Sequence, residues 1–255
     1  MNGLRRFEPL GKDYAASVSH AQGRTLGLVM ERAVPKSSDL CLDVGTGTGH
    51  MALALAVKAR AVVGADPAAG MLAEGVRLAG ERGMRNLSWV RAEAGRLPFR
   101  DASFDLVTSR TAAHHFPDLA AACREWARLL RSAGRCVVTD LQGHEDAALQ
   151  AFVHGIEVLH DPSHVRSHPT SAWRAALSAA GLAGIRIEEG FLETEDGMSL
   201  ADWCRRSRTP AADMAEIARR LRSAPGPWRD LLGVREEGGD LRFRIWKLVA
   251  SAARR

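Results

Sequence analysis

The sequence predicts an α/β fold in which a mostly parallel sheet is covered by helices on both faces. From Asp39 onward, short apolar, β-rich segments alternate with segments whose apolar residues recur at helical spacing. This order is typical of parallel strands joined by right-handed crossover helices. In addition, the first of these strands runs into a glycine-rich turn that opens a helix, as expected for a doubly wound sheet.

Length and composition are compatible with one such domain. The chain has 255 residues, of which 46% are hydrophobic, and this suffices for a sizeable core. No apolar run approaches the roughly 18–20 residues that cross a bilayer, and the first residues lack the apolar stretch of a signal peptide. The cysteines are scattered, without a Cys-x-x-Cys pair, at Cys41, Cys123, Cys136 and Cys204. We therefore expect reduced cysteines in a cytoplasmic protein without a membrane partner.

Strands and helices alternate in the first part of the chain. Strands are expected at Leu40–Val44, Ala61–Ala65, Leu87–Ala92, Phe104–Ser109 and Arg135–Asp140. Helices are expected between them at His50–Lys58, Ala68–Arg82 and Leu119–Leu130, and before them at Ser19–Ala33. The repeated order predicts a parallel sheet with its covering helices.

After Asp140 the pattern changes to several helices and two late strands. Helices are expected at Glu145–Leu159, Thr170–Ala180, Leu200–Arg206 and Ala211–Leu221. Thr170 is expected to cap its helix, and Gly181 to end it. Strands are expected at Gly184–Glu193 and Leu241–Ala250, the latter after a turn at Glu237–Asp240, and Pro225-Gly226-Pro227 is expected to interrupt the region between them.

The stretch most informative about function is the turn Asp43-Val44-Gly45-Thr46-Gly47-Thr48-Gly49. Its glycines let the backbone approach a ligand closely, and the helix that follows directs amide donors and a positive helix terminus at that ligand. A lone turn of this kind could bind any phosphate or nucleotide. Its spacing is Asp-x-Gly-x-Gly-x-Gly, whereas the dinucleotide fingerprint is Gly-x-Gly-x-x-Gly, so the spacing and Asp43 argue against a dehydrogenase.

Acidic residues follow the next two predicted strands, at the edge where open α/β sheets bind ligands. Asp66 ends the second strand and can accept hydrogen bonds from both hydroxyls of a ribose, although it could instead cap the helix that follows Pro67. Glu93 ends the third strand, where its carboxylate can accept from an adenine amino group. The amide of Ala94 can donate to a ring nitrogen of the same adenine. The three features together indicate a nucleoside-containing ligand.

These residues resemble the motifs of the class I S-adenosylmethionine (SAM)-dependent methyltransferases. The resemblance continues through Leu97-Pro98-Phe99, Ser103–Val107, Ala113–Asp118 and Gly134–Asp140, with weaker likeness at Tyr14–Gly23, Asp161–Arg166 and Trp173. It covers about residues 7 to 190 and is nearest to the type 11 small-molecule enzymes of the ubiquinone and menaquinone biosynthesis kind. The departures are Thr46 for a common Cys, Glu93 for a more usual and shorter Asp, and Arg131-Ser132-Ala133-Gly134 for Arg-Pro-Gly-Gly.

The resemblance implies a Rossmann-like seven-stranded sheet, mostly parallel with an antiparallel last strand, and a helical cap. It implies one domain over residues 1–255, with an N-terminal lid or helix at 1–34, a SAM-binding core at 35–140, cap helices and the sixth strand at 141–232, and the last strand at 233–255. It also implies SAM as the cofactor. The residues expected to bind SAM are Asp43, Gly45, Thr46, Gly47, Gly49, Asp66, Glu93, Ala94 and Arg110.

The sequence indicates less about the residues that act on the methyl acceptor. Methyl transfer from a sulfonium is an in-line displacement that depends on positioning and desolvation, and it needs a base only when the acceptor is protonated. His115, just beyond the fourth strand, is the first candidate for that base. His114 and His115 could instead be structural, one of them capping the helix near Pro117. Tyr14 and His20 are further candidates for catalysis from the N-terminal segment, and lid packing is an equal alternative for Tyr14.

The segment after residue 160 offers candidates for substrate contact. His164 and Arg166 are expected to contact the substrate, and the guanidinium of Arg166 would suit an anionic or carbonyl-bearing molecule. His164 and His168 lie four residues apart, but nearby prolines make a regular helix there doubtful and no cysteine accompanies them. We therefore expect no metal site.

We expect methyl transfer from SAM to an O, N or C atom of a small metabolite. One alternative is a SAM-binding scaffold or regulator, including a cyclase-like protein, without methyl transfer. Another is an RNA or protein methyltransferase recruited by the basic C-terminal face, since the net charge is +5. Ser109–Ala113 cannot supply the Asn/Asp-Pro-Pro-aromatic motif typical of enzymes that methylate nucleic-acid amino groups, and aromatic residues for base stacking make up only 5%. The interleaved acidic residues favour a solvated helical face, and the sequence leaves the oligomeric state open.

Overall fold

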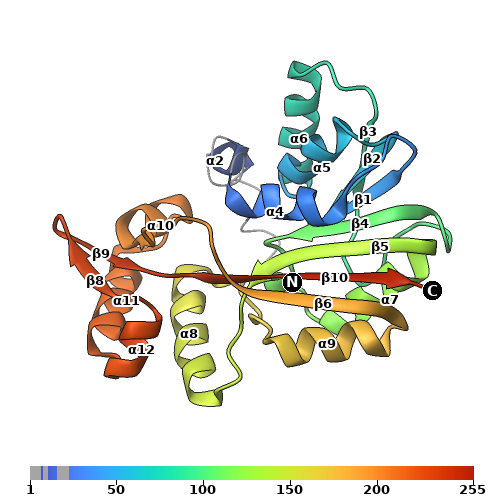
Figure 1. Cartoon of the computed structure of the whole chain (residues 1–255). Helices are drawn as coiled ribbons and strands as arrows, with labels where there is room; N and C mark the ends of the chain where they lie inside the picture. Colours follow the sequence, from blue (N-terminus) through green and yellow to red (C-terminus); the bar gives the residue numbers. More distant parts are fainter. Residues whose placement is uncertain (1–6, 8–10, 16–22) are drawn as a thin grey trace.

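The computed structural model of the chain describes residues 7, 11–15 and 23–255. Its centre is a seven-stranded sheet in the order β3-β2-β1-β4-β5-β10-β6 (Figure 1). Strand β10 runs antiparallel to both of its neighbours, whereas β1 to β5 pair in parallel. The predicted mostly parallel sheet with an antiparallel last strand is therefore confirmed.

The elements have the following bounds. The strands of the large sheet are β1 (Leu40–Val44), β2 (Ala61–Asp66), β3 (Leu87–Arg91), β4 (Phe104–Arg110), β5 (Leu130–Leu141), β6 (Leu182–Leu192) and β10 (Trp246–Arg254). The helices are α2 (Gly11–Ala15), α4 (Arg24–Ala33), α5 (His50–Ala56), α6 (Ala69–Glu81), α7 (Leu119–Leu129), α8 (Ala147–His160), α9 (Thr170–Ala179), α10 (Leu200–Arg206), α11 (Ala211–Ser223) and α12 (Gly226–Leu231), with a 3-10 turn η2 at Ala113–His115. A small antiparallel sheet contains β7 (Met198–Ser199), β9 (Asp240–Phe243) and β8 (Arg235–Glu237). No described helix is both long and apolar enough to span a membrane.

The central strands are buried on both faces because helices cover both sides of the sheet (Figure 1). Successive side chains of a strand point to opposite faces, so Cys41 packs with α4 and α5 while Leu42 packs with α7 and α9. On the second face, Trp126 of α7 and Trp173 of α9 stack with their ring centroids 6.3 Å apart. This burial explains the nearly continuous apolar character of the strands.

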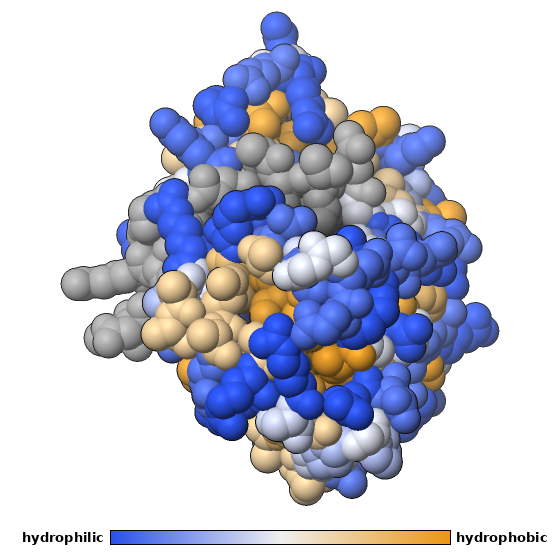
Figure 2. All heavy atoms as spheres, turned by 90° about the vertical axis from the view of Figure 1, so that its left-hand side faces the viewer, coloured by the Kyte–Doolittle hydropathy of each residue, from blue (hydrophilic) through white to orange (hydrophobic). Residues whose placement is uncertain are grey.

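The cap has a small hydrophobic core of its own. Ile156 of α8, Trp203 of α10, Ile217 of α11 and Phe243 of β9 belong to one buried cluster separate from the two clusters of the sheet. In Figure 1 these elements lie to the left of the large sheet. Figure 2 shows this end of the molecule, where hydrophobic residues gather near the middle of a largely hydrophilic face.

Two expectations about the second half of the chain were wrong. The strand expected at Leu241–Ala250 is two strands, because β9 pairs with β8 in the cap and β10 with β5 in the large sheet. The expected interruption at Pro225-Gly226-Pro227 is present, since it separates α11 from α12 and opens α12, in keeping with proline's preference for the first helical turn. Thr170 is the first residue of α9 and its hydroxyl donates to Glu189, so it does not cap the helix.

The N-terminal helix was predicted at Ser19–Ala33, and the structure shows its part from Arg24 to Ala33 as α4. Residues 19–22 lie outside the described residues. The remaining predicted bounds of the core agree within a few residues, except that β5 begins at Leu130 instead of Arg135.

Candidate active site

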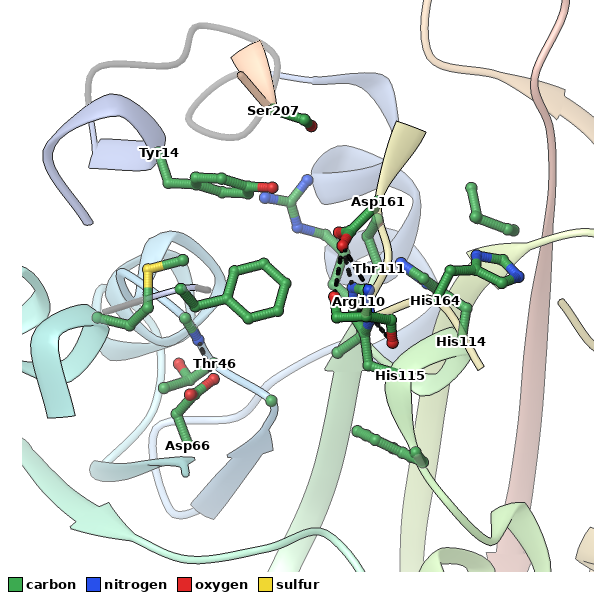
Figure 3. Close-up of a pocket in the computed structure, with 18 of the residues that line it drawn as sticks. Tyr14, Thr46, Asp66, Arg110, Thr111, His114, His115, Asp161, His164 and Ser207 are labelled. Atoms are coloured by element: carbon green, nitrogen blue, oxygen red, sulfur yellow. Dashed lines mark hydrogen bonds and ion pairs between the residues drawn. The ribbon is translucent and has the colours of Figure 1, made fainter. Parts of the chain in front are cut away.

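A cavity of about 580 Å³ lies at the carboxyl ends of β1 to β4 and extends along the cap. Residues of the glycine loop, Asp66, Glu93 and Arg110 line it on the side of the sheet, and residues of α8, α10 and the segment 161–165 line it on the side of the cap. Figure 3 shows side chains from both sides converging on this space, with Tyr14 of α2 above them. A cavity of this size is within the range of small-molecule sites.

The glycine loop is fixed by its backbone. The amides of Gly45 and Thr46 donate to the carbonyl of Ala65 at 2.8 and 3.0 Å, and Gly45, Gly47 and Gly49 all have positive φ angles. A Cβ on Gly45 would lie 2.4 Å from the Cβ of Ala112, and one on Gly49 would lie 2.3 Å from the Trp89 ring. A Cβ on Gly47 would meet none of the described atoms within 4 Å. The first and last glycines are therefore required for packing, and the middle one leaves open space at the cavity.

Asp43 supports this loop from below. Its carboxylate accepts hydrogen bonds from the hydroxyls of Thr46 at 2.6 Å and Thr108 at 2.8 Å. Burial raises the pKa of Asp43 to about 6, since the charged form loses hydration. Asp43 thus ties β1, β4 and the glycine loop together at the floor of the cavity.

Asp66 joins the loop to the next helix. One carboxylate oxygen accepts from the amide of Gly47 at 2.9 Å, and the other accepts from the amide of Ala68 at 2.9 Å. The second contact resembles the capping role considered for Asp66, although α6 itself begins at Ala69. Glu93, which is exposed, and Ala94, which is half-buried, line the same cavity.

Arg110 enters the cavity from the end of β4. Its Nη1 donates to the hydroxyl of Thr25 at 3.3 Å. Burial lowers the pKa of Arg110, while the nearby carboxylates of Glu193 and Asp43 act in the opposite direction. The structure therefore places a guanidinium among the residues expected to bind SAM.

The two adjacent histidines have different environments. Nδ1 of His114 lies 2.6 Å from Oδ1 of Asp140, and the other oxygen of Asp140 accepts from the amides of Ala112 and Ala113 at 2.9 and 2.6 Å. The charge and hydrogen bond of His114, together with the amide of Leu141 and the charge of Lys247, hold the pKa of Asp140 well below its usual range despite burial, and Asp140 raises the pKa of His114. The pair fixes the η2 turn to the end of β5.

His115 lines the cavity, and its hydrogen bond to the backbone indicates which ring nitrogen carries the hydrogen. Its Nδ1 lies 3.1 Å from the carbonyl oxygen of Ser163, and because a carbonyl only accepts, the neutral ring carries its hydrogen on Nδ1 and a lone pair on Nε2. Burial and the neighbouring His114 lower the pKa of His115 to about 4. Nε2 is 4.0 Å from a carboxylate oxygen of Asp161. A neutral imidazole with a free Nε2 lone pair has the properties of a proton acceptor.

Neither histidine caps the following helix. The side chain of Asp118 caps α7 by accepting from the amide of Ala121 at 3.0 Å. The capping role considered for His114 or His115 is therefore wrong.

The other expected site residues are spread out. Tyr14 lines the cavity, and its carbonyl oxygen is 3.2 Å from Nε2 of His50. His164 is buried in the lining. Arg166 is exposed, and the structure does not bring it to the described lining of the cavity. His20 lies outside the described residues. The described part of the chain holds no group of three or more His, Cys, Asp or Glu side chains arranged to bind a metal ion.

Several cavity residues were not expected from the sequence. Lys247 of β10 donates from Nζ to the hydroxyl of Thr111 at 2.8 Å and lies 3.6 Å from Oε2 of Glu193. Glu157 reaches the cavity from α8. Glu157 is the only Asp, Glu, Lys or Arg in the sequence of α8. A lone carboxylate in an otherwise apolar helix could have marked it as a candidate site residue.

The residues of the sheet side fit SAM. The open space at Gly47, the buried carboxylate of Asp66 and the exposed carboxylate of Glu93 line one continuous cavity. A glycine that leaves room for a ligand and carboxylates that accept from hydroxyl and amino groups match the chemistry of an amino-acid nucleoside.

Known proteins share both the sequence and the fold. A family model described as "Methyltransferase domain" matches residues 42–138. The Bacillus subtilis (strain 168) protein YcgJ, named an uncharacterized methyltransferase, is 34% identical over 237 residues and the match covers 92% of each chain. Its crystal structure has a TM-score of 0.85 at 33% identity, with 91% of this chain and 98% of that chain covered.

Two further proteins are informative. A demethylmenaquinone methyltransferase of Thermus thermophilus is 41% identical over 119 residues, which cover 46% of this chain and 52% of that protein. A geranyl diphosphate methyltransferase solved in complex with SAM has the same fold, with a TM-score of 0.65 at 16% identity over 91% of this chain and 84% of that one.

The sheet order and the strand-end cavity define a Rossmann-like α/β fold with its ligand site at the carboxyl ends of the strands. The chain belongs to the methyltransferase family that includes YcgJ. It is a SAM-dependent methyltransferase, so the expected family, fold and cofactor are confirmed.

Proposed function

We propose that this enzyme transfers the methyl group to an O, N or C atom of a small organic metabolite. The observation that carries the proposal is the cavity of about 580 Å³ shared by the sheet side and the cap side. A cavity of this kind can hold a cofactor and a small acceptor together. The demethylmenaquinone methyltransferase that matches 46% of this chain supports an acceptor of small-molecule type.

We propose that the sheet side binds SAM. In this arrangement the glycine loop holds the methionine part, Asp66 accepts from the ribose hydroxyls, and Glu93 with the amide of Ala94 binds the adenine. The Asp66 carboxylate already accepts from the amides of Gly47 and Ala68, which fix its position at the cavity, and a carboxylate is an acceptor suited to hydroxyl donors. Arg110 supplies a positive charge for the carboxylate of the amino acid part. When bound, SAM supplies an electrophilic methyl group on a sulfonium.

We propose that His115 is the general base when the acceptor atom carries a proton. Its Nε2 lone pair accepts that proton, and the carboxylate of Asp161, 4.0 Å away, stabilises the imidazolium that forms. Tyr14 of α2 covers the cavity on the side of the sheet, and α8 and α10, within the proposed cap of residues 141–232, cover it on the other side. These elements exclude water from the reacting atoms.

Nucleic acid is not the acceptor in this proposal. Basic side chains of α11 pair with neighbouring carboxylates, since Arg219 and Arg220 both bind Glu216 and Arg222 binds Glu236. These two carboxylates offset two of the three arginine charges, so α11 carries a mixed-charge face and not a basic stripe.

The test is to incubate the purified protein with SAM carrying a labelled methyl group and an extract of small metabolites. The proposal predicts label in a compound that passes a low-molecular-weight filter. Tight SAM binding without any transfer would contradict it and favour a scaffold role. Label found only in added RNA or protein would contradict the small-molecule acceptor.

A further inference from the structure

Two buried polar side chains on the cap side of the cavity lack hydrogen-bond partners among the described residues. The side chains of Glu157 and His164 are 9% and 1% exposed, and Nδ1 of His164 is 4.0 Å from Oε2 of Glu157, beyond hydrogen-bond distance. Nε2 of His164 is buried without a partner. Buried polar groups in folded proteins are almost always hydrogen-bonded. Both residues line the cavity, and the 4.0 Å between Nδ1 of His164 and Oε2 of Glu157 allows one hydroxyl oxygen to lie within hydrogen-bond distance of both atoms.

The local fold holds the two groups in place. Glu157 lies in the last turn of α8, next to the buried Ile156. The amide of His164 donates to the carbonyl of Asp161 at 2.9 Å, and its ring lies between the rings of His114 and His154, with centroids 5.5 and 5.3 Å away. Figure 3 shows His164 beside His114 at the cavity. The pair is therefore preorganised for a ligand and needs little rearrangement.

The charges around Glu157 and His164 disfavour an acceptor that places a charged group beside them. Burial raises the pKa of Glu157 to about 7 and lowers that of His164 to about 3. His114 and Lys247 act on Glu157 as positive charges, and Asp161 and Asp140 act as negative charges. The cations and carboxyl groups around this position nearly balance, so a buried ammonium or carboxylate would lose its hydration without gaining a full counter-charge. A hydroxyl both donates and accepts without adding charge.

The remaining lining on this side includes an apolar part beside the charged Glu193, Arg206 and Lys247. The apolar side chains there are Leu141, Leu192, Met198, Trp203 and Ile245. Such walls favour an acceptor whose body is hydrocarbon or aromatic.

We propose that Glu157 and His164 form a recognition site for a hydroxyl group on a neutral, otherwise apolar methyl acceptor. The hydroxyl donates to one partner of the pair and accepts from the other, and the apolar walls hold the rest of the molecule. This assignment rests on the proposed small-molecule function, and it makes the two residues determinants of specificity, distinct from the proposed base His115.

The test uses three probes of one shape on the protein loaded with S-adenosylhomocysteine. These are 1-naphthol, naphthalene and 1-naphthylmethylamine, which is cationic at neutral pH, and their dissociation constants are measured by calorimetry. The wild type should bind 1-naphthol at least about 10-fold more tightly than either other probe, the effect of one well-made buried hydrogen bond. Equal affinity for naphthol and naphthalene, or tighter binding of the amine, would overturn the assignment.

Variants test whether Glu157 and His164 cause the preference for 1-naphthol over naphthalene. Glu157→Leu combined with His164→Leu should abolish the preference for naphthol over naphthalene while leaving binding of S-adenosylhomocysteine unchanged. Glu81→Leu, an exposed position on α6 with a salt bridge to Arg77, is the control and should keep the preference. A retained preference in the double variant would refute the role of the pair. Failure of the proposed function is a separate result, namely naphthol preference together with no methyl transfer to any small compound.

Discussion

At the residue scale, Asp140 shows how a side chain outside the cavity lining fixes the site. Its carboxylate accepts from the amides of Ala112, Ala113 and Leu141 and binds the ring of His114. The η2 turn, which carries His115, therefore depends on one buried carboxylate. Removing that carboxylate leaves several buried donors without an acceptor.

Asp140→Ala should lower the free energy of unfolding by about 3–5 kcal/mol, and His114→Ala by roughly 1–3 kcal/mol, because Asp140 keeps its amide donors in the second variant. Urea unfolding measures both values. Asp230→Ala, at an exposed position on α12, is the control and should change stability by less than about 0.5 kcal/mol. A loss in His114→Ala as large as that in Asp140→Ala would contradict the assignment.

The same pair gives stability a defined pH dependence. The pKa of Asp140 is lowered on folding, so its contribution is present above the unfolded pKa and is lost as the pH falls through the folded value. The pKa of His114 is raised, so its contribution is present below the unfolded value of about 6.5 and is lost as the pH rises through the folded value. The cost of His114→Ala should therefore be larger at about pH 5.5 than in alkaline buffer. Unfolding curves of both proteins at the two pH values test this, and the reverse order would contradict it.

His115→Ala should slow turnover roughly 10²- to 10⁴-fold if the acceptor atom is protonated, and it should leave SAM affinity intact. Because the pKa of His115 is lowered to about 4, the imidazole is neutral across the neutral range and its titration should not limit the rate there. The pH profile of kcat/KM for the acceptor found in the labelling screen provides the measurement. His144→Ala, outside the described lining of the cavity, is the control, and full activity of His115→Ala would make His115 structural.

The sequence identified the site residues whose positions follow from local order. Asp66 and Glu93 follow strands, and the ends of parallel strands meet at one edge of a sheet, so their convergence could be predicted. Glu157 and Lys247 come from the cap helix and the last strand. Tertiary packing brings both residues to the same cavity, and no short sequence motif predicts that packing.

At the element scale, the glycine loop gives a test in which one position serves as the control of another. Gly49→Ala should lower stability by about 2–5 kcal/mol, from the left-handed backbone and the overlap with Trp89. Gly47→Ala should cost only about 1–2 kcal/mol, since its Cβ meets none of the described atoms, yet it should weaken SAM binding. Equal destabilisation in urea, or unchanged SAM affinity of Gly47→Ala, would contradict the division of roles.

Element types were easier to predict than their pairings. Apolar residues alternate from Leu241 to Ile245, and the alternation breaks at Trp246. The chain leaves the cap sheet after Phe243 and enters the large sheet at Trp246. At the crossing, the amide of Arg244 donates to the carbonyl of Leu232, a contact between distant parts of the chain. Strand pairing of this kind depends on partners that periodicity alone does not identify.

At the scale of the whole molecule, the order of the large sheet follows from the βαβ alternation, whereas the cap does not. The cap has its own hydrophobic core around Trp203 and Ile217, and its small sheet was absent from the expectations. Since the cap supplies walls of the proposed acceptor side, the motifs of the core predict the methyl donor but not the acceptor.

The overall charge should not give nucleic-acid affinity. We expect no binding of a fluorescently labelled RNA even at about 50 mM salt, where counterion release favours any phosphate-binding protein. The reason is that Glu216 and Glu236 offset two of the three arginine charges of α11, which leaves no basic stripe on that helix. Fluorescence anisotropy provides the measurement, and affinity that falls steeply with salt would restore nucleic acid as an acceptor.

The most direct test of the account is calorimetric titration of SAM into the wild type, Asp66→Ala and the exposed control Asp230→Ala. Asp66→Ala should weaken SAM binding by about 1.5–3 kcal/mol, or roughly 10- to 150-fold, because it removes a carboxylate acceptor at the ribose position and releases the amide of Gly47. The control should bind as the wild type does. Unchanged affinity of Asp66→Ala would mean that SAM does not occupy the cavity at the strand ends.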